Sequence, residues 1–563
     1  MKNKMMKKIL VMLMAAVIVF SGCSYLASAE YNKGTIYQVE PKPTYGNSQN
    51  NMMGNSQNTM KEQMEAALKQ LVEEGVLTEA KATELKSYLE KNRPVKGSKG
   101  QSKGTQDPIR GAIEAGIITQ SQAQKLGEIL RPTGENKESG KKQRPGNNQV
   151  PGNNQGTGNS QGPREQVSSI AFKEAKAIEA KLLKDAGYSA SKSGYPIVDT
   201  GQEEFYSDRS EISEPDEDDD FYGQDGNYEG NTPDYTDNGD GTITDNVTGL
   251  MWQQDPGEKM TWEEAVENIK DFELAGYDDW RLPTIKELYS LIQFNGITEK
   301  SADSSTPYID TDYFEFEYGD VTGERFIDSQ YATSTIYEST TMNGNTTMFG
   351  VNFADGRIKG YGINSKKFYV MYVRGNTNYG MNDFVNNGDG TITDLSTGLM
   401  WLKYDSGHFE AGQDEDGKMD WEEALEWAED LEYAGYDDWK LPDAKELQSI
   451  VDYTRSLDTT NSAAIDSMFK STSIVDVNGE KNYPFYWTST THLEGRELGI
   501  NAVYVAFGEA LGYMNNEFMD VHGAGAQRSD PKTGDKEEYP QYKGPQGDSR
   551  IVYNFVRAVR IAD

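Results

Sequence analysis

The sequence predicts an α+β protein in which one domain type is used twice. The segment DNGDGTITDNVTGLMW (237–252) returns as NNGDGTITDLSTGLMW (386–401), and residues 260–292 return with few changes at 419–451. In each copy helical patterns come first and short, turn-bounded strand patterns come last, an order typical of α+β domains. Duplication at this similarity favours a binding or display role over a single buried active site.

The N-terminus, residues 1–29, has the pattern of a signal peptide. A basic start, MKNKMMKK, precedes an apolar run over 9–20 that is too short to span a bilayer. The single cysteine, Cys23, follows small residues in a segment that resembles a bacterial lipobox. We predict acylation at Cys23, with a lipid anchor in the membrane and the protein on the extracellular face of the cell envelope. Cleavage after Ala29, which would give a secreted protein, stays open.

Four segments precede the repeats. Residues 30–59 are rich in Asn, Ser, Gln and Met and are predicted to be a low-complexity tether, and residues 60–131 contain two helical hairpin patterns. The Gly- and Asn-rich residues 132–163 are predicted to form a disordered linker. Residues 164–195 are predicted to contain a helix and a lead-in. The repeats then occupy 196–376 and 377–563.

Each repeat predicts a hairpin followed by two capped helices. The NGDG segment lies between alternating Thr and Ile residues, as expected of a hairpin turn. A capping residue followed three positions later by Glu predicts the start of each helix. Glycines 276 and 435 are predicted to end the first helix of each copy. The predicted capping pairs are Thr261 with Glu264, Thr284 with Glu287, Asp420 with Glu423, and Asp443 with Glu446.

Charge and residue inventory exclude several functions. The net charge is −36 and most of the acidic residues follow position 200, so the repeats would repel a nucleic acid. The three histidines, His408, His492 and His522, have no counterpart in the other copy, which excludes a duplicated transition-metal site. No cysteine nucleophile or nucleotide-binding loop occurs in the repeats. We therefore expect no enzyme activity and no cofactor. The segment 522–535, present only in the second copy, is interpreted as a surface insertion, with a functional loop as the alternative.

Several motifs resemble the Lcl C-terminal domain, a bacterial domain family named after the Legionella collagen-like adhesin. They are NGDGTITDNVTGLMW, GYDDWRLPTIKEL, FYWTSTTH, GVNFADGRIKGY and VRAVR. The resemblance covers about 196–563 in two copies. The WRLPT and terminal VR motifs are also similar to the C-type-lectin-like and formylglycine-generating-enzyme branch. The resemblance implies C-type-lectin-like modules and cell-surface binding. It transfers no catalytic residue.

Two sets of residues are candidate sites. The acidic hairpin loops have a spacing similar to that of calcium loops, although neither copy offers a Glu at the twelfth position. An Asx-stabilised hairpin turn is the other interpretation, so calcium stays a candidate only. The candidate cation ligands are Asp237, Asp240, Asp245, Asp389 and Asp394. The Asp278–Asp279 and Asp437–Asp438 pairs are interpreted as capping or turn residues.

Aromatic residues divide into core and candidate surface positions. Tryptophans in matched or motif positions are predicted to be core: Trp252, Trp280, Trp401, Trp439 and Trp487. Tyrosines in the late loops are candidate contacts for a glycan or a surface protein: Tyr337, Tyr361, Tyr513 and Tyr542. The sequence thus favours a non-catalytic, adhesin-like surface binding protein. An envelope enzyme acting on polysaccharide and a structural display scaffold are the alternatives.

Overall fold

The computed structural model describes residues 68–69, 79–91, 117–118, 170–188, 194–514, 516–543 and 547–562. The chain divides into two compact units, Met1–Gly156 and Thr157–Asp563. The first unit contains α3 (Glu79–Lys91), within the first predicted hairpin, and Leu85 of this helix is fully buried. Cys23, Ala29, the tether and the linker lie outside the described residues. None of the described helices is long and apolar enough to cross a membrane.

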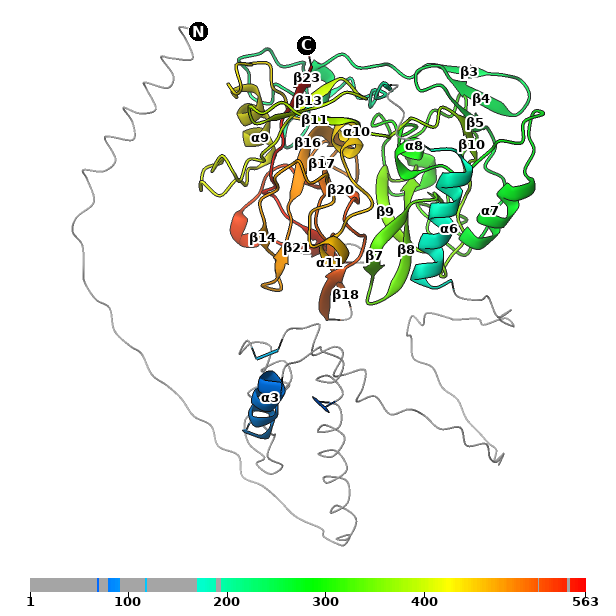
Figure 1. Ribbon diagram of the computed structural model, residues 1–563. Helices are drawn as coiled ribbons and strands as arrows, with labels where there is room; N and C mark the ends of the chain where they lie inside the picture. Colours follow the sequence, from blue (N-terminus) through cyan, green and yellow to red (C-terminus); the bar gives the residue numbers. More distant parts are fainter. Residues whose placement is uncertain are drawn as a thin grey trace, which may run out of the picture. The chain divides into compact units, whose positions relative to one another are not determined.

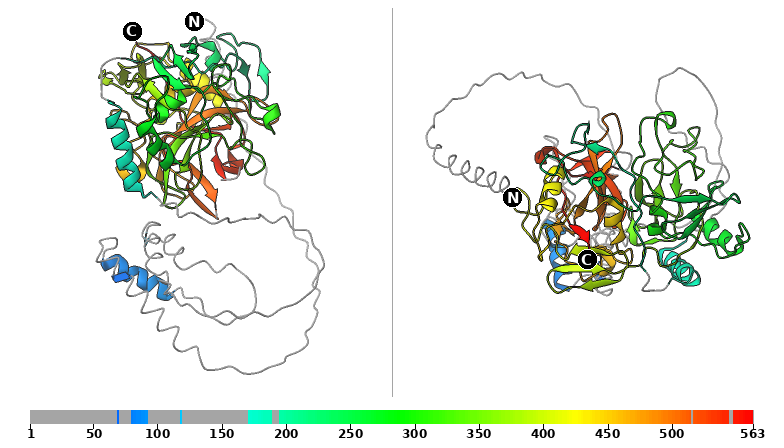
Figure 2. Two further views of the ribbon diagram at one scale, coloured as in Figure 1. Left: turned by 90° about the vertical axis from the view of Figure 1, so that its right-hand side faces the viewer. Right: turned by 90° about the horizontal axis from the view of Figure 1, so that it is seen from above.

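The second unit contains both repeats, preceded by a helix and a lead-in segment. Helix α6 (Phe172–Asp185) lies against β7 and β8 of the first repeat. We call residues 194–231 the lead-in segment; it includes the first residues of the predicted first repeat (196–376), which precede β3. It contains a two-stranded sheet, β1 (Phe205–Tyr206) with β2 (Glu211–Ile212), and the short helix η1 (Asp225–Asn227). In both Figure 1 and the view from above in Figure 2, the green first repeat and the yellow-to-red second repeat lie side by side.

The first repeat is an α+β domain whose first and last strands meet. Its last strand, β10, pairs antiparallel with β5 in a four-stranded sheet of order β10-β5-β4-β3. Two short helices follow β5, and a long β-hairpin follows them. The elements are β3 (Tyr235–Asp237), β4 (Thr242–Asp245), β5 (Leu250–Gln253), α7 (Trp262–Asn268), η2 (Ile269–Asp271), α8 (Ile285–Tyr289), η3 (Ala302–Ser304), β6 (Gln330–Tyr331), β7 (Ile336–Thr341), β8 (Asn345–Asn352), β9 (Arg357–Gly362) and β10 (Val373–Gly375).

The second repeat has the same plan with an insertion near its end. Its last strand, β23, pairs with β13 as β10 pairs with β5. The mixture of helices with mainly antiparallel sheets agrees with the predicted α+β class. The elements are β11 (Phe384–Asn386), β12 (Thr391–Asp394), β13 (Leu399–Leu402), α9 (Trp421–Glu429), α10 (Ala444–Ser449), α11 (Leu457–Thr460), β14 (Ile474–Val475), β15 (Lys481–Asn482), β16 (Phe485–His492), β17 (Asn501–Ala506), β18 (Leu511–Met514), β19 (Glu517–Asp520), β20 (Gln527–Pro531), η4 (Lys536–Glu538), β21 (Gln541–Lys543), β22 (Asp548–Arg550) and β23 (Val559–Ile561).

The predicted helix starts are confirmed, but the predicted helix ends are wrong. All four capping boxes form, with each capping side chain accepting from the backbone N–H three residues later. Helices α7 and α9 end at Asn268 and Glu429, well before the two glycines. Gly276 instead occupies a positive-φ position (78°) in the turn closed by Leu274 and Tyr277, whose backbones exchange two hydrogen bonds. The turn, and not the helix end, requires the glycine.

One seven-stranded sheet runs through both repeats. Its order is β16-β17-β20-β9-β8-β6, with β7 also paired to β8. Strand β20 joins the repeats because it pairs with β17 of its own repeat and with β9 of the other. Residues 522–530 are buried, so the interpretation of 522–535 as a surface insertion is wrong for this stretch. A strand that pairs on both sides has no edge to expose.

The lead-in segment adds further bonds between the repeats. The Gln202 side chain donates to the backbone oxygens of Phe294 (3.1 Å) and Thr491 (2.8 Å), which belong to different repeats. Tyr195 donates its backbone N–H to the Ser396 carbonyl (2.7 Å) of the second repeat. The five tryptophans predicted to be core are all at most 5% exposed, which confirms that prediction.

Candidate functional site

Four strands before and after the segment 522–535 of the second repeat form a small sheet that carries partly exposed aromatic rings. Its strand order is β19-β18-β22-β21, and Figure 1 shows β18 at the lower end of this unit. Tyr513 in β18 lies directly opposite Phe518 in β19, with ring centroids 4.7 Å apart. The Tyr542 ring of β21 lies 4.8 Å from Phe518 and 5.7 Å from Tyr513. We call these three rings the aromatic cluster.

The aromatic cluster is partly exposed to solvent. Tyr513 is 39% exposed, and Phe518 and Tyr542 are half-buried. Aromatic rings held against one another at this spacing stabilise each other and present flat apolar faces. Such faces stack on sugar rings and on protein side chains. Two of the four tyrosines predicted as ligand contacts are thus brought together, and the sequence reasoning missed Phe518, whose place opposite Tyr513 follows from the hairpin register.

Buried charges fix this small sheet to the seven-stranded sheet. The Arg528 guanidinium of β20 contacts the Asp548 carboxylate of β22, which also accepts from His522 Nε2 at 3.1 Å. Strand β22 in turn pairs with β18 and with β21. These contacts to Asp548 link β22, and through it β18 and β21, to the seven-stranded sheet.

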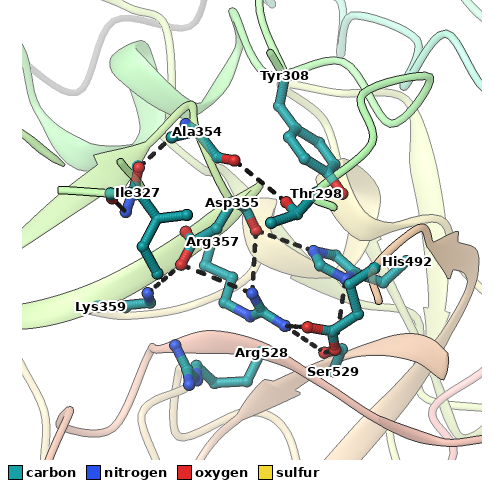
Figure 3. Close-up of polar contacts among 12 residues, drawn as sticks. Thr298, Tyr308, Ile327, Ala354, Asp355, Arg357, Lys359, His492, Arg528 and Ser529 are labelled. Carbon is teal, nitrogen blue, oxygen red and sulfur yellow. Dashed lines mark hydrogen bonds and ion pairs between the residues drawn. The ribbon is translucent and has the colours of Figure 1, made fainter. Parts of the chain in front are cut away.

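A second group of buried charges lies between the repeats (Figure 3). In this view Arg357 and Lys359, both on β9, point toward the carboxylate of Asp355. Arg357 Nη2 also contacts Glu494 Oε2 (2.7 Å) and donates to Ser529 Oγ (2.8 Å), which connects the first repeat to two segments of the second. His492 Nε2 donates to the Asp355 carbonyl at 3.0 Å and its ring stacks on Tyr308. We call Asp355, Arg357, Lys359, His492, Glu494 and Ser529 the junction network.

Burial and charge set the protonation of the junction network. Burial, together with the charge of Arg357, lowers the pKa of His492 to about 3, so this imidazole is neutral at neutral pH. Burial would raise the pKa of Glu494, but the charges of Arg357 and Arg550 hold it well below its usual value. Burial lowers the pKa of Lys359 to about 7 despite the opposing charge of Asp355. The junction network therefore holds the two repeats together, through the contacts of Arg357 with Glu494 and Ser529.

The side chains of the candidate cation ligands stabilise turns by accepting hydrogen bonds from nearby residues. Asp237 accepts from Gly239 N (2.8 Å), and Asp240 accepts from the Thr242 N–H (3.2 Å) and hydroxyl (2.6 Å). Asp389 repeats the second pattern with Thr391. Asp245 and Asp394 are buried and accept from backbone N–H groups two residues on. Over the described residues no group of three or more His, Cys, Asp or Glu side chains could hold a metal ion. The geometry is that of Asx turns, and calcium binding stays a prediction.

The other two candidate tyrosines are not in loops. Tyr337 lies in β7 and is 1% exposed, and its hydroxyl donates to Asp520 at 2.9 Å. Tyr361 lies in β9 and is 7% exposed. The expectation that these two rings contact a ligand is wrong. Both tyrosines lie in strands of the seven-stranded sheet, and their side chains are buried there.

One aspartate of each acidic pair before the WRLP or WKLP motif, Asp279 or Asp438, binds an arginine of the last strand of its repeat. The local sequence does not indicate this contact. Arg374 donates from Nε (2.6 Å) and Nη2 (3.1 Å) to the Asp279 carboxylate, and its guanidinium lies 3.7 Å from the Tyr277 ring centroid. Arg560 makes the same contacts with Asp438 and Tyr436. We call these two sets the arginine clamps. The terminal VR motif thus fastens the last strand of each repeat to the segment before its second helix.

The chain belongs to the class of tandem-domain proteins, because it contains two similar α+β domains, and these share one sheet. The family model of the Lcl C-terminal domain matches residues 241–374 and again residues 390–522. The two repeats are therefore Lcl C-terminal domains, as their motifs predicted. The second match ends before β20, the strand that joins the repeats. No curated protein and no solved structure shows significant similarity to the chain.

Proposed function

We propose that this chain is a lipid-anchored binding protein of the bacterial cell surface and that the aromatic cluster contacts a glycan ligand. The observation that carries the proposal is the partly exposed packing of Tyr513, Phe518 and Tyr542 on one small sheet. Flat aromatic faces take up sugar rings with little loss of side-chain entropy, because each ring has few rotatable bonds. The leader with Cys23 supports export and anchoring.

The contacts that link the small sheet to the seven-stranded sheet support binding in particular. A surface that is ordered before the ligand arrives loses less entropy on binding. Asp548, held by Arg528 and His522, supplies that order for β22 and hence for both neighbouring strands. The net charge of −36 disfavours polyanionic ligands, so a neutral or cationic glycan fits this surface better than a sulfated one.

Each repeat is further proposed to have a C-type-lectin-like architecture. In each repeat the last strand pairs with a strand near the start of the domain, β10 with β5 and β23 with β13. This pairing supports the assignment because it brings the two ends of each domain together. The position of the second helix directly after the WRLP or WKLP motif supports it as well.

The test is a glycan array probed with the full chain and with a Tyr513→Ala/Tyr542→Ala double variant. We expect saturable binding that falls at least about tenfold in the double variant, because each lost ring removes about 1 kcal/mol or more of stacking. Val475→Ser is the matched control, since Val475 is 74% exposed and lies in a different small sheet. Glycan binding that the double variant retains, or no saturable binding to any glycan on the array, would contradict the glycan proposal. Loss of acyl labelling in Cys23→Ser tests the anchor separately.

A hydrolytic function is the second candidate, and one pair of residues favours it. Burial and the neighbouring charge of Asp520 raise the pKa of Glu509 to about 8, and burial raises that of Asp520 to about 7. A protonated carboxyl group near neutral pH is what a general acid requires. Loss of polysaccharide cleavage in Glu509→Gln, with cleavage present in the parent protein, would support this candidate over simple binding.

A further inference from the structure

The same backbone position of each repeat is bound by a segment that precedes the strands of the repeats. The motifs YATSTIY and YWTSTTH are equivalent, so Ile336 of β7 corresponds to Thr491 of β16. The Glu179 carboxylate of α6 accepts from the Ile336 N–H at 2.9 Å. The Gln202 side-chain oxygen, in the lead-in segment, accepts from the Thr491 N–H at 2.7 Å. The two repeats thus present the same donor to two different upstream segments.

The backbone carbonyl groups of these two residues are bound by the same segments. Lys176 Nζ of α6 donates to the Ile336 carbonyl at 3.2 Å and forms an ion pair with Glu179 at 2.5 Å. In the second repeat the Gln202 side-chain nitrogen donates to the Thr491 carbonyl at 2.8 Å. Strands β7 and β16 are the outermost strands of the seven-stranded sheet. An unpaired N–H and carbonyl on such an edge would be open to pairing with another chain, and the upstream side chains close that position.

A tyrosine from each upstream segment also covers the cation of the WRLP or WKLP motif. Arg281 Cζ lies 5.4 Å from the Tyr188 ring centroid, and Arg281 Nε donates to the Tyr188 hydroxyl at 2.9 Å. At the equivalent place of the second repeat, Lys440 Nζ lies 4.8 Å from the Tyr228 ring centroid. Two upstream segments of different sequence therefore meet the same two features of the domain, the edge backbone and this cation.

The two upstream segments differ in how deeply they are buried. Gln202 and Asp225 of the lead-in segment are buried, and Gln202 bonds to both repeats. Of the 14 residues of α6, only Ala175 and Glu179 are buried. A helix with few buried side chains opens at a lower free-energy cost than the core of a domain. We therefore expect α6 to leave the first repeat while both repeats stay folded.

We propose that the outer edge of β7, together with Arg281, is a segment-docking site and that residues 170–188 are its exchangeable ligand within the chain. The site takes a helical segment with a lysine and a glutamate three residues apart for the edge backbone, followed by a tyrosine for the arginine. The start of the segment is fixed because the Ile170 N–H and carbonyl both bond to the Asn364 side-chain amide, at 2.9 and 3.0 Å. This docking site is independent of the aromatic cluster, so its test does not bear on glycan binding.

The test uses the full chain with a site-specific protease sequence inserted within residues 189–193, directly after the docked segment. After cleavage we expect the N-terminal fragment to stay bound and to exchange with a fluorescent peptide of residues 168–190, whose saturable binding fluorescence anisotropy measures. A Glu179→Ala peptide should bind at least about tenfold more weakly, because the Ile336 N–H loses its acceptor. Glu174→Ala is the matched control, since Glu174 is exposed in the same helix, and its affinity should stay within about threefold.

Three outcomes would overturn the proposal. The N-terminal fragment could leave only when the repeats unfold, the released site could fail to bind the peptide saturably, or the Glu179→Ala and Glu174→Ala peptides could bind equally well. Hydrogen exchange of the uncleaved chain gives a second readout. The α6 amides should exchange at least about a hundredfold faster, relative to their intrinsic rates, than those of β8 and β17. Equal protection would make α6 an integral part of the domain and would also overturn the proposal. If the cleaved chain fails to fold, this measurement decides the question.

Discussion

At the scale of single residues, the arginine clamps show how one side chain combines several contacts. Each arginine makes two hydrogen bonds to one carboxylate and also stacks on a tyrosine ring, at 3.7 Å for Arg374 and 3.9 Å for Arg560. Lysine carries the same charge but has neither the planar fork nor the stacking face. The clamp therefore depends on the shape of the guanidinium as much as on its charge.

We predict that Arg374→Lys lowers the free energy of unfolding by about 1 kcal/mol, and that Arg560→Lys does so by a similar amount. Urea denaturation of each full-length variant measures the change. Arg209→Lys is the control, because the Arg209 side chain is 86% exposed and its guanidinium contacts the adjacent Asp208. A loss no larger than that of the control would show that the clamps do not contribute to stability.

Asp530 gives a pH dependence with a defined sign. Burial raises its pKa from about 3.8 to about 8, so between these values the folded state holds a proton that the unfolded state has lost. Its stabilising contribution is therefore complete below about pH 4 and is lost as pH rises toward 8. Asparagine does not titrate. The stability of the parent protein relative to Asp530→Asn should fall by up to about 1.4 kcal/mol per pH unit across this window. A constant difference between the two proteins would contradict the assignment.

At the scale of elements, the helix starts could be predicted from the sequence, whereas the pairing of strands that lie far apart in the chain could not. The four helix starts follow from a capping residue and a Glu three positions apart, so both partners lie in one short segment. Strand β20 lies in HGAGAQRSDPKTGD, which has no alternation of apolar residues. It is buried because it pairs with β17 and β9, and β9 lies about 170 residues earlier in the chain. No local pattern encodes that pairing.

The junction of β9 with the second repeat predicts a sensitive glycine. A Cβ on Gly360 would lie 2.4 Å from the His522 carbonyl oxygen and 2.8 Å from Thr347 Cγ2, and the backbone atom cannot move freely. We predict that Gly360→Ala costs about 1–3 kcal/mol of stability through overpacking. Gly323→Ala, where a Cβ meets nothing within 4 Å, should cost less than about 0.5 kcal/mol. Equal effects in chemical denaturation would show that the contact with His522 is not tight.

At the scale of the whole second unit, duplication predicted two similar domains but not how they are joined. The presence of two copies and the α+β class follow from the matching motifs. The aromatic cluster was foreseen only in part, since Tyr513 and Tyr542 were predicted to contact a ligand and Phe518 was not. The shared sheet, the junction network and Gln202 all join residues of different copies. Such contacts arise from the three-dimensional meeting of the copies, which a sequence read one copy at a time does not contain.

These contacts predict that the two Lcl C-terminal domains unfold together. Unfolding of one domain would remove Glu494 and Ser529 from Arg357 and would separate β9 from β20, and the loss of these contacts disfavours a state with one domain unfolded. Calorimetry of full-length Arg374→Lys and Arg560→Lys distinguishes coupled unfolding of the two domains from independent unfolding. The two substitutions weaken equivalent clamps in different repeats. In a coupled unit each variant shifts the whole main transition to lower temperature by a similar amount. With independent domains, each variant would shift only part of the heat absorbed and would split the transition in two.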